Sequence, residues 1–183
     1  MSVPRFKRKP TGMDYVENAY FIQVETLHLA SKLNSKWITI YQKPIQEYAC
    51  KQADLINMVF SISPNRYEDI LLRRAFLMLS RCFLNVLDKK MTDMVDVLYT
   101  NPVGCFGRKN GKYYSFSEAQ AMLDKKLEIL GNAYAKQFDL IQGVLESDNK
   151  KLKGMDRKIE IPDEELLNMV VSKVIKTLCL GNF

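Results

Sequence analysis

The residues from Ile62 to Tyr99 constrain the fold more than any other part of the chain. Pro64 prevents Ser63 from continuing an earlier helix, because the proline ring clashes with a helical conformation of the residue before it. Asn65 then predicts an N-cap, with Glu68 completing a capping box. Apolar side chains follow every three or four residues: Phe76, Leu79, Phe83, Leu87, Met91, Met94 and Leu98. This spacing predicts a helix of about nine turns, on the order of 50 Å long, that buries its stripe against partners of similar length.

Three further stretches have helical spacing. One covers residues 13–33, and a second runs from about residue 35 to Ile62. Pro44 inside the second stretch either opens its main helix in the first turn or kinks a longer helix. The third stretch begins at Ser115, which with Glu118 makes a second capping box. Its predicted inner face consists of Leu123, Leu127, Leu130, Tyr134, Phe138, Ile141 and Leu145.

These stretches predict an all-α fold, an antiparallel up-down-up-down four-helix bundle over residues 13–146. A basic N-terminal arm, residues 1–12, precedes the bundle. Between the third and fourth helices, the Asn110-Gly111 pair favours a type I′ turn and predicts a small β-hairpin over about residues 103–114.

Residues 147–161 are rich in charged side chains and are interpreted as a linker to a C-terminal helix over residues 162–180. Pro162 suits the first turn of that helix. The acidic residues after it would stabilise the helix by interacting with the positive N-terminal end of its dipole. The helix has a broad apolar face, which docks either on the bundle or on a partner. We expect the partner-binding residues to be Leu167, Val170, Val171, Val174, Ile175 and Leu178.

The sequence offers little for catalysis. His28 is the only histidine of the chain, which removes Ser-His-Asp and Cys-His arrangements. Glu25 and His28 have the Glu-x-x-His spacing of half a di-iron site, but that site needs a second such motif. The glycines of residues 107–112 lack the spacing of a phosphate-binding loop. We therefore expect a protein that is not an enzyme and that needs no metal or cofactor.

The sequence predicts neither a membrane protein nor a secreted protein, and neither a zinc site nor a redox-active cysteine pair. No apolar run approaches the ~20 residues that a membrane span needs, and the N-terminus lacks the apolar core of a signal peptide. The four cysteines have neither zinc-site nor redox spacing, which is typical of reduced thiols in a cytoplasmic protein.

The positive charge is concentrated in the connections. The chain has a net charge of +6. Residues 1–10 carry +4, residues 100–115 carry +3 and residues 147–160 carry +2, which leaves −3 for the remainder. Clustered basic segments suit a polyanion such as nucleic acid, although basic termini can also serve solubility alone.

The candidate nucleic-acid-binding residues combine cations for phosphates with aromatic rings for unpaired bases. The tyrosines can instead pack over the end of the bundle. Of the adjacent Arg73 and Arg74, we expect one to pair with an acidic neighbour and the other to reach an interface or a phosphate. The candidates are Arg5, Lys7, Arg8, Lys9, Arg74, Arg108, Lys109, Lys112, Tyr113 and Tyr114.

The order of these features resembles a bacterial four-helix-bundle family that includes proteins encoded in intervening sequences of 23S ribosomal RNA genes. The closer branch is the accessory variability determinant protein of diversity-generating retroelements. The similar segments are residues 1–5, residues 62–74 with Pro64 and the arginine pair, and residues 111–123 at the start of the fourth helix. Residues 147–183 have no counterpart in this family.

The resemblance implies a non-enzymatic helper that forms a homo-oligomer, typically a pentamer. Such proteins bind a reverse transcriptase and its template RNA, or an RNA/DNA hybrid, during mutagenic complementary-DNA synthesis. The alternative is a protein-interaction or assembly module that docks a partner through residues 162–180. A third class, a metalloenzyme, would need His28 to share a metal with ligands of a neighbouring subunit.

Overall fold

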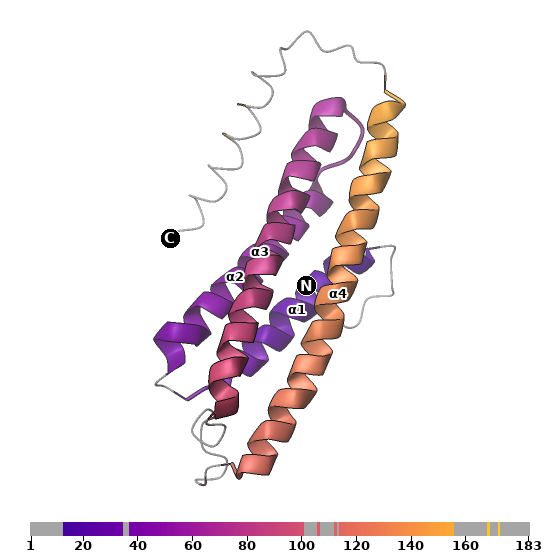
Figure 1. Cartoon of the computed structure of the whole chain (residues 1–183). Coiled ribbons are helices and arrows are strands. Elements are labelled where there is room, and N and C mark those ends of the chain that lie inside the picture. The colour runs from indigo at the N-terminus through magenta and orange to yellow at the C-terminus, as the bar shows by residue number, and fades with distance from the viewer. Residues whose placement is uncertain are drawn as a thin grey trace, which may run out of the picture.

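The protein is an all-helical bundle in the computed structural model (Figure 1), which describes residues 13–34, 37–100, 106, 112, 114–155, 168 and 172. Four α-helices and one π-helical turn make up the named elements of these residues. They are α1 (Asp14–Ser31), η3 (Ile38–Gln42), α2 (Lys43–Ser61), α3 (Tyr67–Thr100) and α4 (Phe116–Lys153). The predicted all-α bundle is confirmed for this part of the chain.

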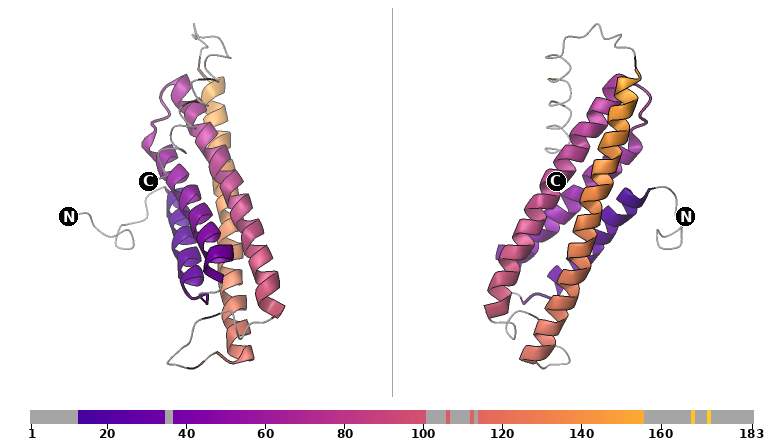
Figure 2. Two further views of the ribbon diagram at one scale, coloured as in Figure 1. Left: turned by 90° about the vertical axis from the view of Figure 1, so that its left-hand side faces the viewer. Right: turned by 45° about the vertical axis from the view of Figure 1, so that its right-hand side comes forward.

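Each helix packs against its neighbours in the sequence, and α4 also packs against α1, which closes the bundle. The chain runs alternately down and up through the four helices (Figures 1 and 2). The helices differ in length, because α3 has 34 residues and α4 has 38, whereas α1 has 18 and α2 has 19. The two short helices therefore cannot cover the whole length of the two long ones.

Two predicted helix starts are confirmed. Pro44 lies in the first turn of α2, where its missing N–H would have no intrahelical partner in any case. The π-helical turn comes directly before it, and the rings of Trp37 and Tyr41 pack there with centroids 5.6 Å apart. Ser115 caps α4 reciprocally, since its Oγ accepts from the N–H of Glu118 and the Glu118 carboxylate accepts from the N–H of Ser115.

Two other predicted boundaries were wrong. Asn65 is not the N-cap of α3, because the helix begins only at Tyr67 and Arg66 accepts its first backbone hydrogen bond, from Ile70. The side-chain amide of Asn65 donates to the hydroxyl of Ser63 instead. The predicted linker also begins too early, since α4 continues to Lys153. Asp148, inside that stretch, is buried in the bundle. The three lysines of the last turn stabilise the helix by interacting with the negative C-terminal end of its dipole.

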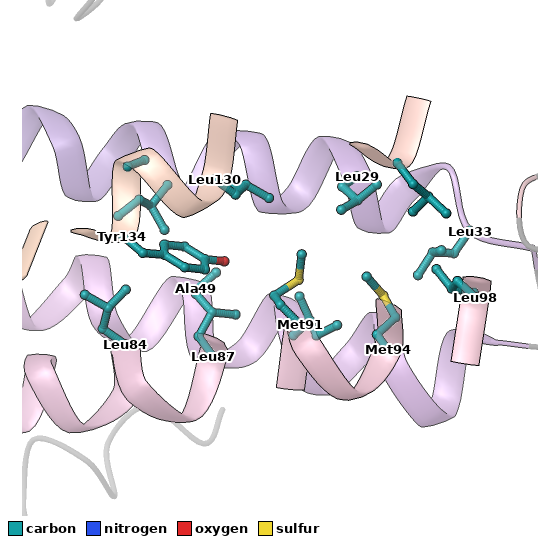
Figure 3. Packing of buried hydrophobic residues seen from close by; sticks show 14 of the residues in the cluster. Leu29, Leu33, Ala49, Leu84, Leu87, Met91, Met94, Leu98, Leu130 and Tyr134 are labelled. Atoms are coloured by element: carbon teal, nitrogen blue, oxygen red, sulfur yellow. The ribbon is translucent and has the colours of Figure 1, made fainter. Parts of the chain in front are cut away.

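The core divides into two apolar clusters along the bundle. The larger cluster packs residues of all four helices at the end of the bundle where α1 and α3 end and α2 and α4 begin, next to the π-helical turn (Figure 3). The smaller cluster packs the start of α1, the end of α2, the start of α3 and the second half of α4. Of the predicted inner residues of α3, Phe76, Leu87, Met91, Met94 and Leu98 are buried, and Leu79 and Phe83 are partly buried.

A polar layer lies where the two clusters meet, with one buried residue from each helix. Asn18 of α1 donates to the Gln137 side chain and to the backbone oxygen of Ala133, and Gln137 of α4 donates to a backbone oxygen of α1. Ser80 of α3 donates to the backbone oxygen of Gln52 in α2. The fully buried side-chain amide of Gln52 has no hydrogen-bond partner among the described residues. Such an unsatisfied buried amide is costly to the folded state.

Most of the predicted hairpin and C-terminal helix lies outside the described residues, so both stay predictions. The described Phe106 is fully buried in the larger cluster and forms an isolated antiparallel bridge with Leu33, at the end of α1. No helix in the described part of the chain is long and apolar enough to cross a membrane.

We expect the substitution Gln52→Met to raise the free energy of unfolding by about 1 kcal/mol, because it replaces an unsatisfied buried amide by an apolar group of similar size. Gln137→Met serves as the matched control. It should lower the free energy of unfolding by about 1–3 kcal/mol, since it removes one acceptor of the Asn18 amide and the donor to the backbone oxygen of Tyr15. Urea denaturation measures both. A loss of stability in Gln52→Met would contradict the assignment of its amide as unsatisfied.

Candidate nucleic-acid interface

The structure describes three of the predicted nucleic-acid-binding residues, namely Arg74, Lys112 and Tyr114. The remaining predicted residues lie outside the described part of the chain. They are Arg5, Lys7, Arg8, Lys9, Arg108, Lys109 and Tyr113 for nucleic acid, and Leu167, Val170, Val171, Val174, Ile175 and Leu178 for a partner.

At the end of the bundle where α3 ends and α4 begins, an aromatic pair joins the connecting segment to the core. The ring of the half-buried Tyr114 meets the ring of Phe106 edge-on, with centroids 5.9 Å apart. Tyr114 also packs against the larger core cluster, as expected if the tyrosines cover the end of the bundle, and its stacking on a base stays a prediction. Lys112, in contrast, is exposed. Sequence reasoning missed Phe106, whose only signal is an aromatic residue in a glycine-rich, basic segment.

Arg74 is far from this end. It lies near the start of α3, and the helix extends about 39 Å further to Thr100 at 1.5 Å per residue. A nucleic acid that contacts both Arg74 and Lys112 would therefore have to follow most of the length of the bundle. Arg74 is only partly accessible, and its buried Nη1 atom has no acceptor among the described residues. The structure therefore does not bring it together with Lys112 in one site.

Its neighbour Arg73 joins three helices at this second end of the bundle. Its Nε lies 3.2 Å from Oδ2 of Asp148 in α4, and both side chains are almost completely buried. Its Nη1 donates to the backbone oxygens of Val59 and Ile62, at 3.1 and 3.0 Å, and so satisfies carbonyls at the end of α2. The expectation that one arginine of the pair has an acidic partner is confirmed for Arg73.

A pocket of about 400 Å³ lies next to this ion pair, between the start of α1 and the second half of α4. Burial raises the pKa of Tyr15 in its wall, and the nearby Arg73 partly offsets that rise. Gly143 contributes no side chain to the wall, and Lys151 and Asp139 place opposite charges around it. The mixed charge gives the pocket no clear preference for an anion or a cation.

Exposed basic side chains also surround this end of the bundle, although the pattern has a structural explanation. Arg66 precedes α3, and Lys150, Lys151 and Lys153 lie in the last turn of α4, all of them exposed. Lysines at a helix C-terminus stabilise the helix through its dipole whether or not they bind a ligand. Sequence reasoning placed these lysines in a linker and missed that they belong to the last turn of α4.

The half di-iron motif is used differently in the fold. The carboxylate of Glu25 makes an ion pair with Lys126 of α4, and His28 is exposed, with its Nδ1 3.9 Å from the other Glu25 oxygen. Among the described residues, no three histidine, cysteine, aspartate or glutamate side chains gather closely enough to hold a metal ion.

Comparisons with protein-family models, with curated proteins and with solved structures found no match to this chain. The geometry of the described residues and the sequence pattern therefore carry the functional argument.

We expect Arg73→Met to lower the free energy of unfolding by about 3 kcal/mol or more, because it leaves the carboxylate of Asp148 buried without a partner. The double variant Arg73→Met with Asp148→Leu should recover part of this loss, since it removes both charges together. Arg74→Met is the matched control and should have a much smaller effect. Equal losses in the two single arginine variants, measured by urea denaturation, would contradict this role of the ion pair.

Proposed function

We propose that the protein is a non-catalytic, RNA-binding accessory protein. In this proposal it associates with a reverse transcriptase and its template RNA, or an RNA/DNA hybrid, in a diversity-generating retroelement, as the resemblance of its helical pattern implies. It acts as a homo-oligomer, with a pentamer favoured. The partner enzyme and the stoichiometry come from the resemblance alone, whereas the binding of a polyanion has a separate argument from charge.

The observation that carries the proposal is the separation of charge between the bundle and its connections. Residues 13–34, 37–100 and 114–155 contain 15 of the 27 basic side chains and 16 of the 21 acidic ones. The bundle is therefore close to neutral, and the remaining residues carry the whole positive excess. A concentration of positive charge in a few segments of the chain favours the binding of phosphates.

The N-terminal arm and the connection between α3 and α4 are the proposed contact segments. The first carries Arg5, Lys7, Arg8 and Lys9, and the second carries Arg108, Lys109 and Lys112 on the predicted hairpin of residues 103–114. The described Lys112 is exposed and supports this placement. Tyr113 and Tyr114 are the candidates for stacking on an unpaired base, with Tyr113 favoured because the half-buried Tyr114 packs against the core.

The triple substitution of Arg108, Lys109 and Lys112 by glutamine should weaken the binding of structured RNA. It should also reduce the slope of log affinity against log salt concentration by about 2 to 3, since each of the three phosphate contacts releases about 0.7 to 0.9 of a counterion. Fluorescence anisotropy titrations with RNA and duplex DNA at several salt concentrations measure both effects.

A matched control removes the same charge from the bundle. Lys43, Lys125 and Lys136 are exposed on three different positions of α2 and α4, and no ion pair is formed by any of them among the described residues. Their triple glutamine variant should bind RNA with nearly unchanged salt dependence. Equal losses in the two variants would indicate binding to net charge alone, and unchanged affinity in the first would remove the connection from the interface.

The oligomer is tested on the same protein by measuring its mass in solution, with light scattering after size exclusion. We expect a single species of about five chains, as the resemblance implies. A monomer that binds RNA with a steep salt dependence would retain the RNA-binding part of the proposal and contradict the oligomeric part. A species that is indifferent to RNA would overturn the proposed function.

A further inference from the structure

The first half of α3 is apolar on the face that points away from the core. Leu71, Ala75, Met78, Cys82 and Val86 follow one another at steps of three or four residues and form what we call the outer stripe. None of them is buried, and Met78 and Val86 expose 50% and 37% of their surface. Because the opposite face of the same turns is buried in the bundle, this half of the helix is apolar on both sides.

The second half of α3 has a different outer face. The same steps of three and four residues continue from Val86 to Lys89, Asp93, Asp96 and Thr100, all of them polar. Lys89 and Asp93 make an ion pair of 2.9 Å on the surface. A helix that is apolar on one face only is suited to solvent, whereas one that is apolar on both faces is suited to burial. The change after Val86 therefore marks the end of a surface that is built to be covered.

We propose that residues 162–180 of the same chain cover the outer stripe as a fifth helix. Their six apolar residues, Leu167, Val170, Val171, Val174, Ile175 and Leu178, have the spacing of one helix face. At 1.5 Å per residue this face is about 17 Å long, and the outer stripe is about 22 Å long. The stripe is therefore long enough to receive the whole face without reaching Lys89.

The place where α4 ends supports an occupant from the same chain. Asp148 in the last turns of α4 contacts Arg73 at 3.2 Å, so the chain leaves α4 beside the start of the outer stripe. Residues 154–161 can span up to about 26 Å, which exceeds the helix diameter of about 10 Å that they have to cross. A helix that follows would run parallel to α3 and antiparallel to α4, which continues the alternation seen in the bundle (Figure 2).

Two described residues of the segment agree with its division into an apolar face and an exposed face. Asn168 and Ser172 are both helical and exposed. At about 100° per residue, both fall outside the arc that the six apolar residues occupy. The start of the segment also carries Asp163, Glu164 and Glu165. These carboxylates would come near Arg74, which borders the outer stripe and has a buried Nη1 atom without an acceptor among the described residues.

The experiment uses Cys82, the thiol of the outer stripe, in the full-length chain. Cys50, Cys105 and Cys179 are replaced by alanine, and a second cysteine is introduced by Val174→Cys on the apolar face. A short bismaleimide then links thiols that lie close together, and mass spectrometry locates the link. The matched control is Ser172→Cys, only two residues away and on the exposed side. Circular dichroism confirms that each variant keeps its helical content.

We expect Val174→Cys to be linked to Cys82 within one chain, at least about tenfold more than Ser172→Cys and independently of protein concentration. A link between two chains would show that a second copy covers the stripe and would overturn the proposal. The absence of a link in both variants would overturn it as well. None of these outcomes depends on RNA binding, so the proposed function is tested separately.

A second measurement keeps Cys82 as the only thiol and compares Val174→Asp with Ser172→Asp. A buried aspartate would displace the segment from the outer stripe. Val174→Asp should therefore speed the alkylation of Cys82, and Ser172→Asp should leave its rate close to that of the cysteine-reduced parent. Equal alkylation rates in the two variants would contradict the proposal even if both are fully folded.

Discussion

The guanidinium of Arg73 holds together one end of the bundle, and several other features of the structure depend on it. It comes from α3, satisfies two carbonyls at the end of α2 and neutralises Asp148 of α4. A buried charge requires an opposite charge and acceptors for its N–H groups. Here α4 supplies the opposite charge and the end of α2 supplies the acceptors. The position of α4 relative to the junction of α2 and α3 is thereby fixed. The contact also explains why a stretch as polar as residues 147–153 is helical, since its one inward-facing charge has a place in the core.

The polar layer determines how the helices are aligned along the bundle axis, whereas the apolar clusters drive their association. Asn18 can donate to Gln137, and Gln137 to the backbone oxygen of Tyr15, only when α1 and α4 are aligned at this level. A shift by one turn would place an amide among the apolar residues of either cluster, at the cost of an unsatisfied group. The two clusters on either side can tolerate many apolar combinations, whereas this layer tolerates few. Specificity in the bundle therefore rests on the few polar residues inside it.

The long apolar repeats were sufficient to predict four helices, because a pattern over ten or more residues outweighs local exceptions. Local capping was predicted correctly at Ser115, where the serine and Glu118 satisfy each other. It was wrong at Asn65, because α3 begins at Tyr67 and the first backbone bond of the helix is accepted by Arg66. The end of α4 could not be predicted, since the partner of Asp148 is 75 residues away in the sequence. The burial of Phe106 could not be predicted for the same reason, because it depends on contacts with residues distant in the sequence, such as Leu33.

The separation of charge from core has a consequence for how this protein can change in evolution. Substitutions that alter the attraction for a polyanion fall mainly on connections, and those that alter stability fall mainly on the inner faces of the helices. Mutations at distant, independent sites have nearly additive effects. The two properties can therefore drift or adapt with little constraint on each other, so related bundles can keep this architecture while their basic segments diverge in length and composition.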